Sequence, residues 1–295
     1  MPVSIYPPSR ASAARADRRR PEDAILYAIL DDVRTTLRMG WVDPAIRAVS
    51  SNQVFLSAAW SATRPNITKS FAIGADRLRS AALATIRDSF PPADHREALE
   101  LAIPSAERDR AQRTMLAIHC GAARVLLVVQ AWAILARRQR IGGTGVEEPP
   151  AKRGVPTWQE GLVAPPRMVS PEAEALLDDA TVALGVVSTP PVLQTAALWP
   201  HYLEVAWRDL HPVVTGPQWQ QSLLALRRVA AEVLRSLPHP MDLQWDVLSR
   251  RGLPEGEREP LADHLTALAA AMPVALLVAA YLAEALGTTD APADW

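Results

Sequence analysis

The sequence predicts an all-α protein made of two tandem helical repeats that form a pseudo-dimer around a central pocket. Two stretches, residues 115–136 and 265–286, are apolar almost all round, which is typical of helices buried on most faces. At an offset of 150 residues, the Leu-Leu-Val run at 126–128 falls on the same run at 276–278. A chain that contains its most buried helix twice is expected to have duplicated a whole unit.

The repeat extends upstream of these two helices. At an offset of 147 residues, the spacing F-L-x-x-A-W-x-x-x-x-P that begins at Phe55 returns as Y-L-x-x-A-W-x-x-x-x-P from Tyr202. A small insertion explains the difference between the two offsets. We therefore expect a disordered basic arm over 1–21, repeat 1 over 22–136, a linker over 137–170, repeat 2 over 171–287 and a tail over 288–295.

Proline and capping residues divide repeat 1 into helices. The expected helices run from Pro21 to Gly40, then up to about Thr63, from about Thr68 to Asp88, around 94–101, and from a capping Ser105 to the end of the first apolar stretch. Between the first two, Asp43 stands directly before Pro44. Because a residue before proline disfavours the α conformation, we expect Asp43 at a turn or a helix N-cap.

Repeat 2 begins with the cap signal Ser170-Pro171-Glu172. Its expected helices run from Pro171 to about Leu184, from about Val192 to Leu210, from Pro217 to Leu237, over 243–250, and from about Glu255 onward. The Thr189-Pro190-Pro191 turn mirrors the turn at Asp43. The linker lacks periodicity, so it should follow the surface, with Trp158 or Leu162 as an anchor.

Composition limits the partners and the compartment. The chain has 295 residues and a formal net charge of −1, which gives no reason to expect nucleic acid. A single cysteine, Cys120, excludes an internal disulfide framework. The N-terminus has no apolar run typical of a secretory signal, so we expect a cytoplasmic protein.

Both apolar stretches approach the roughly 20 residues that span a bilayer. Polar residues and a proline interrupt them, namely His119, Arg124 and Gln130 in the first and Pro273 and Glu284 in the second. The remaining helices are amphipathic and need an apolar surface to cover. We therefore favour buried core helices and expect no membrane partner.

Few residues outside these patterns suggest chemistry. No phosphate loop, dinucleotide fingerprint, GxSxG or HExxH motif occurs, and the histidines lack metal-ligand spacing, so we expect no metal. His119 is either a core histidine or a functional one. Arg124 lies in an apolar helix and needs a partner, either a protein carboxylate or a bound anion.

Three segments resemble a known family: LDDVRTTLRMGWV at 30–42, AAW at 58–60 and ALWPHYL at 197–203. They are similar to the DL-2-haloacid dehalogenases of the DehI type, and the similarity extends from about residue 24 to 287. The resemblance implies a pseudo-dimeric helical fold with its pocket between the repeats. It also implies hydrolysis of small 2-haloalkanoic acids without a cofactor. In that reaction an Asp, helped by an Asn, activates a water that displaces halide directly, and both enantiomers react with inversion.

The residues that the resemblance assigns to catalysis do not match. The family's Asp would fall on Val192 and its Asn on Ala122, and neither side chain can accept a proton or position a water. The chain therefore diverges at the family's catalytic positions. Trp41 matches a pocket tryptophan. The expected pocket is lined by Trp41, Pro44, Ala122, Arg124, Pro190, Pro191, Val192, Leu268 and Met272.

Asp43 is one candidate for the missing base. It lies beside Trp41, and at the 147 offset it is the repeat mate of Pro190, two residues from Val192, where the family's Asp would fall. The alternative is that Asp43 only caps the helix after it. His119, about one turn before Ala122, is the other candidate acid or base, and Arg124 is a candidate to hold a substrate carboxylate. Three functions stay open: a diverged 2-haloacid hydrolase, a cofactor-independent enzyme of other chemistry, and a non-catalytic protein that binds a small carboxylic acid or a protein partner. A homodimer also stays open.

Overall fold

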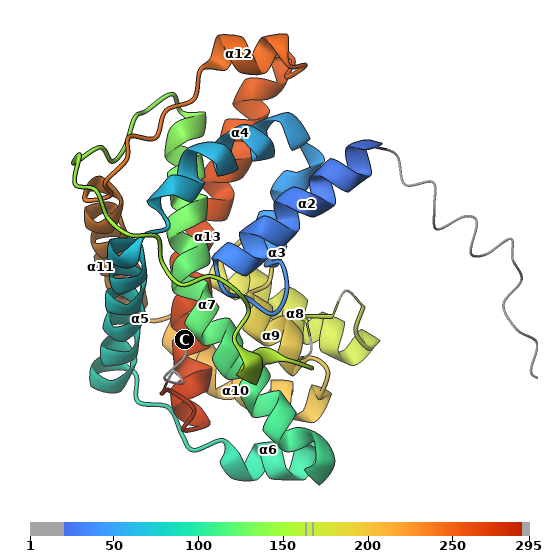
Figure 1. Ribbon diagram of the computed structural model, residues 1–295. Helices are drawn as coiled ribbons and strands as arrows, with labels where there is room; N and C mark the ends of the chain where they lie inside the picture. The colour runs from blue at the N-terminus through green and yellow to red at the C-terminus, as the bar shows by residue number, and fades with distance from the viewer. Residues whose placement is uncertain (1–20, 163, 167, 291–295) are drawn as a thin grey trace, which may run out of the picture.

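The computed structural model describes residues 21–290 apart from 163 and 167 (Figure 1). Residues 1–20 of the arm expected over 1–21, and the end of the tail over 291–295, lie outside the described residues; Pro21 is the first residue of α2 and not part of an arm. Within the described part no β-strand occurs, and the only strand-like pairings there are isolated bridges at Thr68–Pro150 and Ile141–Met241. The predicted all-α class is confirmed.

Helices follow one another in the same order before and after the linker. Before it lie α2 (Pro21–Thr36), α3 (Pro44–Ala48), α4 (Gln53–Thr63), α5 (Lys69–Ser89), α6 (Arg96–Ala102) and α7 (Ser105–Ala136). After it lie α8 (Pro171–Leu184), α9 (Pro191–Ala196), α10 (Pro200–Val214), α11 (Pro217–Arg235), α12 (Trp245–Arg250) and α13 (Arg258–Ala285). In each half a long helix, a very short helix and three further helices precede the longest one. This order supports the predicted repeat.

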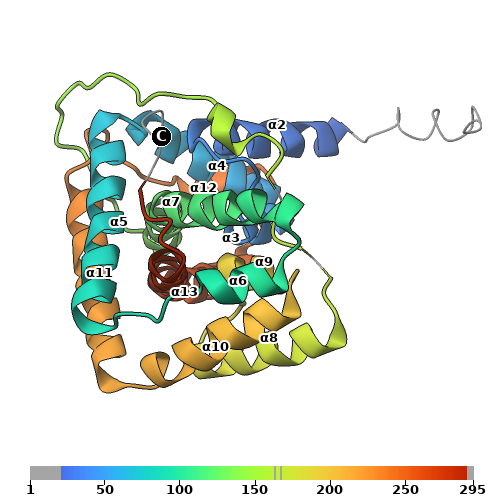
Figure 2. The ribbon, with the colours of Figure 1, turned by 90° about the horizontal axis from the view of Figure 1, so that it is seen from below.

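The core is the pair of longest helices, α7 and α13, which lie side by side in both views (Figures 1 and 2). Their shared Leu-Leu-Val runs, 126–128 and 276–278, are fully buried. The stretches Ser105–Ala136 and Glu255–Ala285 are long and apolar enough to cross a membrane. However, 83% and 78% of their most apolar windows are buried inside the protein. Burial of this kind is what the core helices of a folded domain show.

A second equivalent pair, α5 and α11, packs along one side of the core (Figure 1). The two helices approach closely at Gly74, where an added Cβ would lie 2.5 Å from Cγ1 of Val233. Glycine therefore sets the spacing between these helices. This interface joins the first half of the chain to the second.

Two expected helices are each broken in the structure. The one expected up to Thr63 divides into α3, a 3-10 turn at Val49–Ser51, and α4, because Asn52 caps α4 by accepting a hydrogen bond from Phe55 N at 3.0 Å. The one expected over 192–210 divides into α9 and α10, because Pro200 begins a new helix. The predicted cap at Ser105 is also wrong, since Pro104 occupies that N-cap position.

The linker runs along the surface past α5 and α7 (Figure 1). Trp158 and Leu162 both pack against the core. Between them, Gln159 is buried and donates a hydrogen bond from Nε2 to Arg38 O at 3.3 Å. The linker is thus attached to the segment that connects α2 with α3.

Candidate functional site

The turns that precede α3 and α9 meet at a small cavity, called here the inner cavity. It has a volume of about 10 Å³, which is room for about one water molecule. One wall comes from α13. The lining residues are Asp43, Pro44, Ala45, Ser188, Thr189, Pro190, Pro191, Ala271, Met272 and Ala275. The cavity therefore lies where equivalent segments of the two halves come together.

Asp43 is the only ionisable group among the residues that line the inner cavity. It is the N-cap of α3, and its Oδ1 accepts a hydrogen bond from Ala45 N at 2.8 Å. Its side chain is buried, and no cation among the described residues forms an ion pair with it. Burial raises the pKa of Asp43 from 3.8 to about 6, although the Ala45 hydrogen bond opposes this. Asp43 is therefore both the predicted helix cap and a carboxylate of unusual basicity.

A larger outer cavity of about 560 Å³ lies beside the inner one, and Pro44 lines both. Trp41 and Val42 form part of its wall before α3, and the linker at 164–166 forms another part. Arg47, in the last turn of α3, also lines it. The outer cavity thus presents an apolar wall and one guanidinium next to the buried carboxylate.

The structure brings together some of the predicted pocket residues and separates others. The inner cavity is lined by Asp43, Pro44, Pro190, Pro191 and Met272, and the outer one by Trp41 and Pro44. His119, Ala122, Val192 and Leu268 are not among the lining residues of either, and Arg124 lines a separate cavity. The predicted single pocket is therefore divided between different parts of the fold.

His119 is fully buried, and neither ring nitrogen has a hydrogen-bond partner among the described residues. Burial, helped by the charge of Arg79, lowers the pKa of His119 to about 3. The imidazole is therefore neutral at physiological pH and has little tendency to accept a proton. These properties are those of a core histidine.

Comparisons with known proteins identify relatives of this chain. No family model matches the chain. It is 28% identical over 236 residues to a configuration-inverting 2-haloacid dehalogenase of Pseudomonas sp. (strain 113), covering 77% of this chain and 76% of that protein. It is 24% identical over 252 residues to an (R)-2-haloacid dehalogenase of Rhizobium sp. (strain NHG3), covering 83% and 96%. The chain is homologous to 2-haloacid dehalogenases.

Solved structures of 2-haloacid dehalogenases show the same fold. A D-2-haloacid dehalogenase mutant in complex with D-2-CPA superposes with a TM-score of 0.78 at 21% identity, covering 91% of this chain and 96% of that one. The D-2-haloacid dehalogenase in complex with L-LA gives a TM-score of 0.77, also at 21% identity, covering 91% and 94%. The predicted resemblance to 2-haloacid dehalogenases is confirmed.

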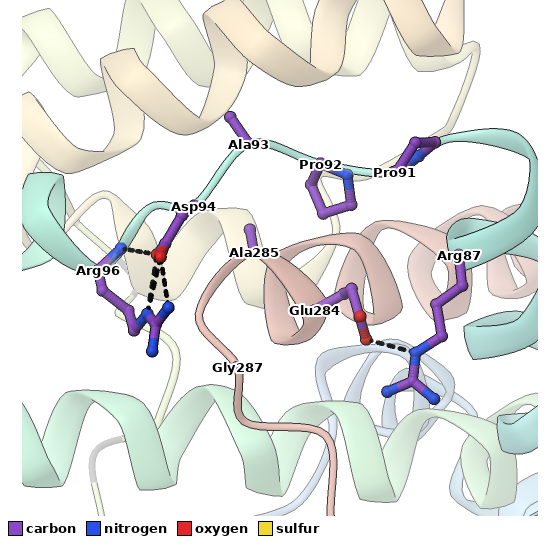
Figure 3. Close-up of a pocket in the computed structure, with 9 residues that line it drawn as sticks. All are labelled: Arg87, Pro91, Pro92, Ala93, Asp94, Arg96, Glu284, Ala285 and Gly287. Atoms are coloured by element: carbon purple, nitrogen blue, oxygen red, sulfur yellow. Dashed lines mark hydrogen bonds and ion pairs between the residues drawn. The ribbon is translucent and has the colours of Figure 1, made fainter.

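This dehalogenase homologue has another cavity, of about 300 Å³, between the α5–α6 loop and the end of α13 (Figure 3). Its charged groups neutralise one another. Arg87 Nε donates to Glu284 Oε2 at 2.9 Å, and Arg96 Nε donates to Asp94 Oδ1 at 2.9 Å. The cavity shares no lining residue with the inner cavity. We therefore assign no chemistry to it.

The sequence-based prediction does not include Arg47, although its spacing from Asp43 could have placed it in the site. Arg47 lies four residues after Asp43, and side chains at that spacing share one face of a helix. Within residues 21–290, apart from 163 and 167, no group of three or more His, Cys, Asp or Glu side chains is placed to hold a metal ion. The candidate site therefore consists of Asp43 with the inner and outer cavities.

Proposed function

We propose that the chain is a hydrolase that removes halide from small 2-haloalkanoic acids by direct attack of water, with Asp43 as the general base. The homology to 2-haloacid dehalogenases supports the reaction class. The observation that supports the role of Asp43 is its position: a buried carboxylate without an ion-pair partner lines a cavity of about one water in volume.

The reaction follows from this geometry. The Asp43 carboxylate accepts a proton from the water in the inner cavity, and the water oxygen forms a bond to C2 of the acid. The bond from carbon to halogen breaks, and its electron pair leaves with the halide. The product is a 2-hydroxy acid of inverted configuration, and Asp43 then returns its proton to solvent. No cofactor and no covalent intermediate are required.

Burial suits Asp43 to this role. A carboxylate with a pKa of about 6 is more basic than an ordinary aspartate, yet it is mostly ionised at neutral pH. The inner cavity, with a volume of about 10 Å³, has room for about one water beside the carboxylate. Both features favour proton transfer from that single water.

The outer cavity is the proposed substrate site. Arg47 attracts the carboxylate of a 2-haloacid, and Trp41 provides an apolar wall for its alkyl group. Pro44 lines both cavities, so the proposed substrate site adjoins the proposed water site.

A second candidate is a protein that binds a small acid, or a partner protein, without turnover. Two observations favour it. Val192 and Ala122 stand where the family resemblance expects the catalytic Asp and Asn, and the inner cavity is too small for a haloacid. A cofactor-independent enzyme of other chemistry would use the same Asp43.

Halide release from both enantiomers of 2-chloropropionate tests the proposal. Intact protein should release chloride, Asp43→Asn should release none, and Arg47→Gln should show a raised KM. The matched control is Asp109→Asn, since the Asp109 side chain is 80% exposed on α7 and should leave release unchanged. Release that survives Asp43→Asn would overturn the role of Asp43. No release by intact protein at any pH would favour the binding function.

A further inference from the structure

A further cavity, called here the basic cavity, lies between the end of α2, α5, α7 and the linker. It has a volume of about 50 Å³ and shares no lining residue with the inner or outer cavity. Thr36, Arg38, Arg124 and Lys152 line its polar side, and Ile67 and Phe71 belong to its apolar side. No Asp or Glu is among its lining residues.

Two of these cations are buried close to each other. Arg38 and Arg124 are only 3% and 5% exposed. Arg124 Nη1 donates to Leu37 O at 3.0 Å. Burial lowers the pKa of Arg124 to about 10; Asp76 opposes this, and the charge of Arg38 lowers it further. The Asp76 side chain itself is 52% exposed. Two guanidiniums and an ammonium around one cavity favour an anion inside it.

Thr36 adds a hydrogen-bond donor to the same cavity. Its side chain is 5% exposed, and the described residues offer its buried Oγ1 no hydrogen-bond partner. By contrast, the helical residues Thr35 and Thr63 donate to the carbonyl four residues earlier, at 2.8 and 2.7 Å. A bound anion would accept the hydrogen bond that the Thr36 hydroxyl does not make within the protein.

The second half of the chain shows that the fold does not require these polar groups. At the repeat offsets of 147 and 150, Thr36, Arg38 and Arg124 correspond to Ala183, Gly185 and Val274. Arg38 has a φ of 60°, and Gly185 has a φ of 63° at the end of α8. A left-handed backbone at this position favours glycine, so arginine is retained in repeat 1 at an energetic cost.

The cavity also has an approach from solvent. An adjoining cavity of about 280 Å³ shares Thr36 and Ile67 with it and is lined as well by Arg64 and Arg153. Both arginines pair with Asp32, which leaves the approach positive. Anions are therefore drawn toward the basic cavity.

We propose that the basic cavity binds a small monocarboxylate anion, as a second site separate from the inner cavity. The carboxylate would contact Arg38, Arg124, Lys152 and Thr36, and a short alkyl group would lie against Ile67 and Phe71. The volume accommodates a few heavy atoms, and the apolar wall favours an alkanoate over a fully polar oxyanion.

Lysine labelling tests the site directly. Lys152 lines the cavity and is exposed, while Lys69 is exposed outside it, so one digest of the acetylated protein contains the site and its control. Labelling would be followed by mass spectrometry during titration with sodium propionate, with sodium chloride at equal ionic strength in parallel. We expect propionate to slow the acetylation of Lys152 saturably and to leave the acetylation of Lys69 unchanged. Chloride should affect neither rate.

Four variants decide whether binding in the cavity causes the protection. Arg38→Gly reproduces the glycine of repeat 2, so it should fold, and it should raise the half-saturating propionate concentration. Thr36→Val should raise it by roughly 3- to 10-fold, whereas Thr36→Ser retains the hydroxyl and should not. Asp43→Asn should leave the concentration unchanged, which separates this site from the proposed active site. Absence of saturable protection, equal protection by chloride, or protection by phosphate but not propionate would overturn the proposal.

Discussion

Trp60 donates its indole N–H to Asp32 Oδ2 at 2.7 Å, and Trp207 makes the same hydrogen bond to Asp179 Oδ2, also at 2.7 Å. In each pair the two residues are 28 positions apart, and the pairs are offset by 147 residues. The aspartate lies on the first helix of its half and the tryptophan on the third. The same tertiary contact is thus built twice, which supports duplication of a whole unit.

The two tryptophans should therefore contribute similarly to stability. We expect Trp60→Phe and Trp207→Phe each to lower the free energy of unfolding by about 1–2 kcal/mol, because each removes a hydrogen bond to a carboxylate. Urea unfolding of the intact protein measures both. A large loss for one variant and none for the other would argue against equivalent roles.

Asp32 and Asp179 should differ in how much they contribute to stability. Burial opposes ionisation of Asp32, but the hydrogen bond from Trp60 and the charges of Arg64 and Arg153 lower its pKa overall. Asp179 has only the tryptophan bond among its described contacts. Asp32→Asn should therefore cost more stability than Asp179→Asn in the same urea assay, and equal losses would show that the two arginines contribute nothing.

Asp43→Asn should stabilise the protein at neutral pH. The folded pKa of Asp43, about 6, lies above its ordinary value of 3.8, so folding is opposed once the carboxylate ionises. The stability linked to this group is present below about pH 4 and is lost as the pH rises to about 6. Asparagine keeps the cap without the charge. The expected gain at pH 7 is roughly 1–3 kcal/mol, shrinking toward zero at pH 4. A stability difference that does not vary with pH would contradict the raised pKa.

The rate of halide release should depend on the same ionisation. Because the base must be unprotonated, we expect kcat/KM for 2-chloropropionate to rise with pH and to level off above about pH 6. Stopped-time assays from pH 4.5 to 8 measure this, with circular dichroism at each pH to exclude unfolding. A rise of kcat/KM with its midpoint near pH 4 would indicate an ordinary exposed carboxylate instead.

Some of this site could be predicted from the sequence. The residue before Pro44 disfavours the α conformation, and Asp43 does cap α3. The position of Arg124 could also have been deduced, because it lies two residues after Ala122 and their side chains point about 200° apart on a helix. Grouping both in one pocket was therefore inconsistent with helical geometry.

Other features depend on tertiary packing that periodicity does not contain. The sequence predicts continuous helices up to Thr63 and over 192–210, yet the helices break after Ala48 and Ala196. Asp43 and Pro190, which precede α3 and α9, line the same cavity, and local patterns do not show this contact. The size of the inner cavity depends on how Met272 of α13 packs against both turns. No local sequence pattern determines how closely Met272 packs against the two turns.

His119→Leu should stabilise the protein most at acidic pH. The folded pKa of His119, about 3, lies below its ordinary value of 6.5, so the histidine opposes folding as the pH falls from about 6.5 toward 3. Leucine also removes two buried nitrogens without partners. Relative to the intact protein, we expect a gain of up to about 3 kcal/mol at pH 4.5 and a smaller one at pH 7. Halide release should persist, and its loss would return His119 to the list of catalytic candidates.

Gly74→Ala should destabilise the interface of α5 with α11, although alanine is the better helix former by about 1 kcal/mol. The new Cβ would lie 2.5 Å from Val233 Cγ1 and 3.0 Å from Cγ2, so one helix must move. We expect a net loss of about 1–2 kcal/mol. The double variant Gly74→Ala/Val233→Ala should lose less than the sum of its single changes, because the smaller side chain relieves the overlap. Gly256→Ala is the control, since an added Cβ there meets nothing within 4 Å. Strict additivity of the two changes would show that the helices adjust without strain.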